Sequence, residues 1–203
     1  MRVGIFGGTF DPPHLGHLIL AAEAAYQLKL DRLLFVLTAD PPHKQGRAIT
    51  PVEDRLAMLE AALSDNPAFE LSTVEIDRPG PHYAVETMKL LREDHPEDEL
   101  IYLMGGDTLM GLPLVWHLPQ EFVAACDFLG VMRRPEDEID LEELEKSLPG
   151  IKEKVLFIDA PLLEIASREI RQRAAEGQPY RYYLPDSVRK VIRERNLYRN
   201  QHN

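Results

Sequence analysis

Residues 2–17 read RVGIFGGTFDPPHLGH, an apolar stretch that runs into paired glycines and then into a segment with two prolines and two histidines. The apolar part, Arg2 to Phe6, predicts a short strand, and Gly7-Gly8 predicts the turn that ends it. A helix should follow, because apolar residues recur at helical spacing from Leu15 to Tyr26. The prolines suit a helix entrance, and Asp11 is placed to cap it. The stretch therefore predicts a strand, a glycine turn and a helix.

The same alternation continues along the chain. Strands are expected at 32–37, 69–76, 100–104, 127–132 and 155–158, and helices at 51–63, 84–93 and, exposed, at 141–148. Two helical patterns, about 167–176 and 186–195, then follow without a strand between them. The pattern predicts an α/β protein, a Rossmann-like doubly wound parallel sheet with a C-terminal helical extension. We expect one domain over 1–203, with the sheet in about 1–160 and the helical part in about 161–203.

Glycines and ionisable residues gather where the predicted strands end. Ligands of such sheets bind outside the carboxyl ends of the strands, at the point where the winding reverses. Four loops should therefore converge on one face: Gly7-Gly8, Pro41-Pro42-His43-Lys44, Gly105-Gly106-Asp107 and Arg133-Arg134.

Composition limits the classes of function. The 203 residues are 44% hydrophobic and carry a formal net charge of −11, which argues against a general nucleic-acid surface because such surfaces are basic. An anionic ligand would need a local basic pocket. No apolar run approaches the roughly 20 residues of a membrane span, so no membrane partner is expected. The single Cys126 and the absence of a secretory leader predict the cytoplasm.

The histidine-containing segment has the chemistry of an anion site. Paired glycines let a ligand approach the backbone closely, and a helix start offers unpaired N–H groups and a positive dipole end. His14 and His17 should share one face of the helix, with Gly16 leaving room for a sugar or base. The alternatives are an ordinary turn with surface or core histidines, or a zinc site, for which no third ligand is evident.

Residues 7–17 resemble the signature of the HxGH nucleotidyltransferase superfamily, with His14-Leu15-Gly16-His17 as its core. The second signature of that superfamily is similar to Ile165-Ala166-Ser167-Arg168-Glu169-Ile170-Arg171. Ala166 departs from it, because a serine is common there.

Within the superfamily the chain resembles the bacterial nicotinate mononucleotide adenylyltransferases over nearly its whole length. The segments that carry this resemblance are Pro41–Lys44, Gly80–Thr87, Gly105–Asp107 with Trp116, Arg134-Pro135, and Tyr182–Asp186 with Leu197-Tyr198. Ala84 replaces a threonine that is usual in the family. The resemblance implies transfer of AMP from ATP to nicotinate mononucleotide, with Mg²⁺ as the cofactor that accompanies ATP.

The resemblance also implies roles for individual residues. The catalytic residues would be His14, His17 and Arg171. ATP would be bound by Gly7, Gly8, Thr9, Phe10, Gly16, Gly106, Asp107, Ile165, Ser167 and Arg168. The mononucleotide would be bound by Asp11, Lys44, Tyr83, Ala84, Thr87, Trp116 and Arg134. No metal-binding residue is assigned.

Several alternatives stay open at this point. Trp116 could be a core residue, Asp107 a helix cap, and Lys44, Arg134 and Arg168 solvated surface charges. The acceptor could be nicotinamide mononucleotide or another phosphate ester, and a non-catalytic nucleotide sensor is a further alternative. A dehydrogenase is disfavoured, because GxGxxG is missing after the first strand. The sequence has no clear signature of oligomeric state, and a homodimer stays open.

Overall fold

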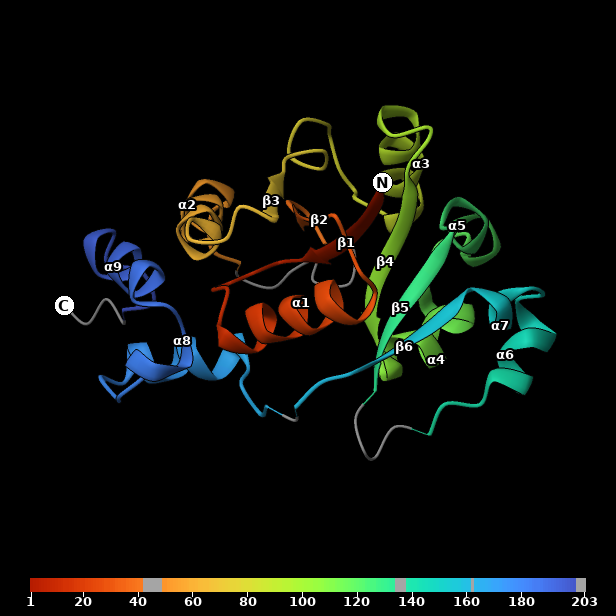
Figure 1. Cartoon of the computed structure of the whole chain (residues 1–203). Coiled ribbons are helices and arrows are strands. Elements are labelled where there is room, and N and C mark those ends of the chain that lie inside the picture. Colours follow the sequence, from red (N-terminus) through yellow and green to blue (C-terminus); the bar gives the residue numbers. More distant parts are fainter. Residues whose placement is uncertain (42–48, 134–137, 162, 200–203) are drawn as a thin grey trace.

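The computed structural model describes residues 1–41, 49–133, 138–161 and 163–199. Its centre is one six-stranded sheet in the order β3-β2-β1-β4-β5-β6, in which all neighbouring strands are parallel (Figure 1). The strands are β1 (Arg2–Gly8), β2 (Arg32–Leu37), β3 (Phe69–Ser72), β4 (Glu99–Gly105), β5 (Phe128–Arg133) and β6 (Val155–Asp159). This is the doubly wound Rossmann-like order, and the predicted fold class is confirmed.

Helices cover both faces of the sheet. In chain order they are α1 (Leu15–Gln27), α2 (Val52–Leu63), α3 (Ala84–Asp94), α4 (Gly106–Val115), α5 (Pro119–Ala125), α6 (Leu141–Ser147), α7 (Ile151–Lys154), α8 (Ser167–Ala175), the 3₁₀ turn η2 (Arg181–Tyr183) and α9 (Asp186–Glu194).

The two faces have separate hydrophobic cores, because successive side chains of a strand point to opposite sides. On β1, Ile5 packs with α3, α4 and α5, whereas Phe6 packs with α1 and α2. Strands buried on both faces are apolar throughout, which is why β2 reads RLLFVL.

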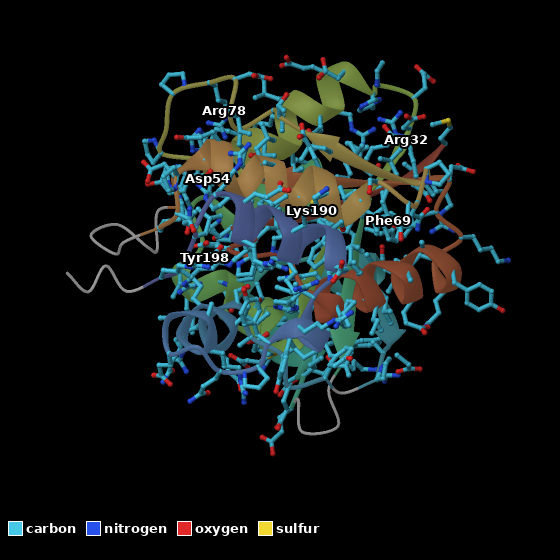
Figure 2. The ribbon with its side chains drawn as sticks, turned by 90° about the vertical axis from the view of Figure 1, so that its left-hand side faces the viewer. Arg32, Asp54, Phe69, Arg78, Lys190 and Tyr198 are labelled. Carbon is cyan, nitrogen blue, oxygen red and sulfur yellow. The ribbon has the colours of Figure 1, made fainter. Side chains whose placement is uncertain are left out.

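A third cluster joins the C-terminal helices to α2. Met58 and Ala62 of α2 pack against Ile170 of α8 and against Val188 and Ile192 of α9. Figure 2 views this side, with α9 in front of α2. Across the described residues, no helix is both long and apolar enough to cross a membrane.

Most predicted elements are present within one or two residues, but several expectations are wrong. The strand expected at 69–76 ends at Ser72, because the Thr73 carbonyl accepts the amides of Ile76 and Asp77 and closes a turn. The helix expected to be exposed at 141–148 buries Leu144 and Leu148. Helices α4, α5 and α7 were not expected at all.

Candidate active site

The site lies where the winding of the sheet reverses, between β1 and β4. These neighbouring parallel strands end at Gly8 and Gly105. Helix α4 begins directly after β4, at Gly106, while α1 begins at Leu15 after a short loop. The predicted convergence of the loops after these two strands is therefore present, and Asp107 lies exposed in the first turn of α4.

The paired glycines do not form the expected turn. Gly7 and Gly8 are the last residues of β1, and neither has a positive φ. A Cβ on Gly7 would lie 2.8 Å from Tyr102 Oη, and one on Gly8 would lie 2.8 Å from Phe10 Cζ. These glycines are required by close packing, while the left-handed turn falls on Phe10, at φ 47°.

The two histidines of the HxGH segment stack on each other at the start of α1. Their ring centroids are 3.6 Å apart with an interplanar angle of 25°. His14 is the N-cap residue, and its main-chain N–H donates to His17 Nδ1 at 3.2 Å. Because Nδ1 accepts a hydrogen, the proton of neutral His17 lies on Nε2. The shared face predicted from the spacing is present.

Burial makes His14 hard to charge. Its side chain is 6% exposed, and desolvation lowers its pKa to about 4, so the imidazole is neutral at neutral pH in the absence of ligand. Its Nδ1 has no hydrogen-bond partner among the described residues. A Cβ on Gly16 would lie 3.0 Å from this nitrogen, so the absence of a side chain at Gly16 leaves room for the His14 ring.

The second signature meets the first across more than 150 residues. Ser167 Oγ donates to the Pro12 carbonyl at 2.9 Å, and Arg171 Nη1 donates to the Asp11 carbonyl at 2.6 Å. Ile165 lies beside Gly16. Ala166 is the N-cap of α8 and supplies no side-chain cap, so the first amides of α8 lack the partner that a serine could offer.

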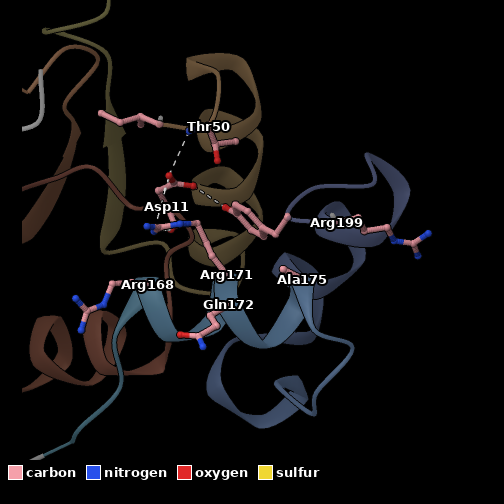
Figure 3. A pocket seen from close by; sticks show the side chains of 9 residues that line it. Asp11, Thr50, Arg168, Arg171, Gln172, Ala175 and Arg199 are labelled. Carbon is pink, nitrogen blue, oxygen red and sulfur yellow. Dashed lines mark hydrogen bonds and ion pairs between the residues drawn. The ribbon is translucent and has the colours of Figure 1, made fainter. Parts of the chain in front are cut away.

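Asp11 does not cap α1, contrary to our expectation. Asp11 is 5% exposed, and its carboxylate accepts hydrogen bonds from Tyr198 Oη at 2.7 Å and from the Thr50 main-chain N–H at 3.3 Å. A pocket of about 510 Å³ lies beside it, with Arg168, Arg171 and Arg199 among its lining residues (Figure 3). A local basic pocket therefore exists on a chain of net charge −11.

A buried arginine that we did not predict holds the surrounding loops together. Arg55 of α2 is 2% exposed and donates to four main-chain carbonyls, those of Thr9, Thr38, Ala39 and Thr50, at 2.7 to 3.1 Å. Burial lowers its pKa from the usual value. A signal was available, because Arg55 falls at helical spacing on the same face of α2 as the apolar Met58, Leu59 and Ala62.

On the other side of β1, aromatic rings line the ends of α3 and α4. Trp116 follows α4, is partly buried, and lies edge-on to Tyr102 at 5.9 Å between ring centroids. Tyr83 is the N-cap of α3 and lies 4.3 Å from the exposed His117 ring. Ala84 is the first residue of α3, which has no side-chain cap.

Thr87 is not placed to touch a ligand, contrary to our expectation. It is 1% exposed, and its hydroxyl donates to Glu75 Oε1 at 2.6 Å inside the protein. Burial raises the pKa of Glu75. Two other expected contacts, Lys44 and Arg134, lie outside the described residues. Within the described ranges, no group of three or more His, Cys, Asp or Glu side chains could hold a metal ion.

This fold, with two signature segments joined at the reversal point, defines a class of nucleotide-handling proteins. The family model described as cytidylyltransferase-like matches residues 5–173. The chain belongs to this cytidylyltransferase-like family.

The relatives to which this chain is similar carry a more specific name than the family. A protein of Thermomicrobium roseum is 46% identical over 98% of this chain and 92% of its own length, and one of Desulfitobacterium hafniense (strain Y51) is 41% identical over 98% and 96%. Both are named probable nicotinate-nucleotide adenylyltransferase. The solved Plasmodium falciparum nicotinic acid mononucleotide adenylyltransferase complexed with NaAD has a TM-score of 0.79, with 97% of each chain covered. At 19% identity this last match shows the fold alone.

Proposed function

We propose that this protein is a nicotinate-nucleotide adenylyltransferase, which joins the phosphate of nicotinate mononucleotide to the AMP part of ATP. The observation that carries the proposal is the joining of the two signature segments at the reversal point of the sheet. Ser167 and Arg171 donate to carbonyls of the segment that also carries the stacked His14 and His17. The names of the relatives support the same activity.

The reaction is a direct displacement at the α-phosphorus of ATP. A phosphate oxygen of the mononucleotide forms the new P–O bond while the bond to the β-phosphate oxygen breaks, and pyrophosphate leaves with that electron pair. A phosphomonoester has a second pKa of about 6, so the nucleophile is mostly dianionic at neutral pH and needs no general base. The protein must therefore supply mainly positioning and charge stabilisation.

The ATP side of the site would be formed by α1 and α8. In this proposal His17 donates from Nε2 to the α/β-phosphate region, where charge builds up in the transition state. Arg171 and the uncapped amides of α8 hold the remaining phosphate oxygens, and Arg168 lies beside them. Bound ATP would raise the pKa of His14, which is neutral without ligand, because an adjacent phosphate stabilises the charged imidazolium.

Mg²⁺ would enter as part of the Mg-ATP substrate. This ion usually keeps several waters and is held largely by substrate phosphates, with few protein ligands. On this chemistry the protein residues would contact the phosphates, and the ion would supply neutralisation of their negative charge. We expect the reaction to take place in the cytoplasm, where a single buried thiol such as Cys126 stays reduced.

The mononucleotide side would be formed by Trp116 and the start of α3. The flat pyridine ring suits stacking on Trp116, and the uncapped amides at Tyr83 and Ala84 suit an anionic ring substituent. Asp107 would contact adenosine or its sugar from the first turn of α4, beside Gly106.

Substrate choice is tested by a coupled pyrophosphate-release assay with Mg-ATP. We expect nicotinate mononucleotide to be consumed much faster than nicotinamide mononucleotide or pantetheine phosphate. Faster turnover of either competitor would overturn the assignment of the acceptor, and no turnover of any would favour a nucleotide-sensing module.

Trp116→Ala should raise the KM for the mononucleotide about tenfold and leave kcat nearly unchanged, because it removes stacking present in both ground and transition states. Steady-state kinetics with Trp116→Phe as a matched control should give a smaller change. Since Trp116 also contacts Phe122, the free energy of unfolding of each variant is measured in parallel by urea denaturation. An unchanged KM with lowered stability would mean that Trp116 serves only the core.

A further inference from the structure

The Asp11 carboxylate lies between two groups that compete for it. Its Oδ1 accepts the Tyr198 hydroxyl at 2.7 Å, and its Oδ2 is 3.9 Å from Arg171 Nη1 (Figure 3). That same Nη1 donates to the main-chain carbonyl of Asp11 at 2.6 Å. The guanidinium and the carboxylate are thus adjacent without forming a close, bidentate ion pair.

Tyr198 reaches this position from the far end of the chain. It follows α9, at a separation of 187 residues from Asp11, and its ring packs among the α2 and α9 side chains, with Met58 Sδ 3.5 Å from its hydroxyl. Burial first, and then the neighbouring Asp11 carboxylate, raise the pKa of Tyr198 above its usual value. The phenol therefore stays protonated and remains a hydrogen-bond donor at physiological pH.

The buried Arg55 cannot take over the role of Tyr198. Arg55 attracts the Asp11 carboxylate electrostatically, but its hydrogen bonds go to four main-chain carbonyls. Without the phenol, Asp11 Oδ1 would be a buried acceptor left with no donor among the described residues, which is a costly arrangement. Arg171 Nη1 is already 3.9 Å from the other carboxylate oxygen, Oδ2, so Arg171 is placed to move closer to the carboxylate when the phenol is missing.

We propose that Tyr198 is a positioning residue for Arg171. Its hydroxyl occupies the Asp11 carboxylate, and this prevents Asp11 from drawing Arg171 into a neutralising ion pair. Arg171 then keeps its charge directed at the phosphates of ATP. The inference rests on the proposed function, in which Arg171 binds those phosphates.

The test is a double-mutant cycle with Tyr198→Phe and Asp11→Asn, read out as the affinity for Mg-ATP by calorimetry without mononucleotide. Tyr198→Phe alone should weaken ATP binding about tenfold, because Arg171 drawn onto Asp11 would lose a charge-assisted hydrogen bond to the phosphates. In the Asp11→Asn background the same change should cost less than about twofold, because a neutral amide cannot pair with and neutralise Arg171.

A merely structural role of Tyr198 gives a different pattern. The loss would then be equal in both backgrounds, and that result would overturn the proposal, as would unchanged ATP affinity in Tyr198→Phe. The control is Tyr180→Phe, because Tyr180 packs against the same cluster. The proposed function is tested separately, by turnover of the wild-type protein with mononucleotide, so the binding cycle tests the role of Tyr198 even if that turnover is absent.

Discussion

His17→Ala lowers kcat by on the order of 100-fold or more, while the affinity for ATP changes only a few-fold. This is the expected result for a donor whose hydrogen bond strengthens as charge builds up between the α- and β-phosphates. A group that bound ground and transition states equally would instead change KM with kcat preserved.

The structure explains why His17 suits this role. Its ring lies edge-on to Phe6 and Phe10, at centroid distances of 6.1 and 5.1 Å, and its Nδ1 accepts the His14 amide. The ring is held in one orientation with its proton on Nε2. A donor that is already oriented stabilises charge without reorganising during the reaction.

Single-turnover kinetics measure the effect on the chemical step directly. His95→Ala is the matched control, because His95 lies beside Asp98 at the start of β4, away from the site. It should leave turnover unchanged. Near-wild-type turnover in His17→Ala would remove His17 from the mechanism.

Arg55→Leu lowers the free energy of unfolding by about 3 to 5 kcal/mol, because the buried guanidinium is lost and four main-chain carbonyls lose their common donor. The carbonyls belong to three separate segments, at Thr9, at Thr38 and Ala39, and at Thr50. The loss therefore loosens the loop that carries Phe10 and Asp11 as well as the end of β2.

Urea unfolding monitored by circular dichroism measures this loss, and Arg55→Lys is the matched control. Lysine keeps the charge but has one nitrogen in place of three, so it should recover part of the stability. Full stability in Arg55→Leu would show that water replaces the guanidinium at these carbonyls.

The sequence by itself determined the class of fold and the core of the site. Alternating apolar strands and amphipathic helices require a parallel sheet, and the reversal of its winding brings the ends of β1 and β4 together. The spacing of His14 and His17 was enough to bring them together, because an N-cap residue and the third residue of its helix are local neighbours.

Elements whose stability comes from tertiary packing were not predictable in this way. Helix α4 contains Gly111 and Pro113, and α5 is short, so local propensity argues against both. They form because Leu109, Leu112 and Phe122 are buried against the sheet. The same packing decides that Gly7 and Gly8 stay in the strand, where Tyr102 and Phe10 leave no room for a Cβ.

The connections around Asp11 depended most on tertiary structure. The sequence placed Asp11 as a helix cap, whereas its carboxylate accepts hydrogen bonds from Tyr198 and Thr50 and its main-chain carbonyl accepts one from Arg171. The partners lie up to 187 residues away, and no local pattern encodes such a pairing. Sequence periodicity indicates which residues form a helix or a strand. Which buried polar groups bind each other is decided by the tertiary structure, because a buried donor or acceptor must pair with a group that folding places next to it.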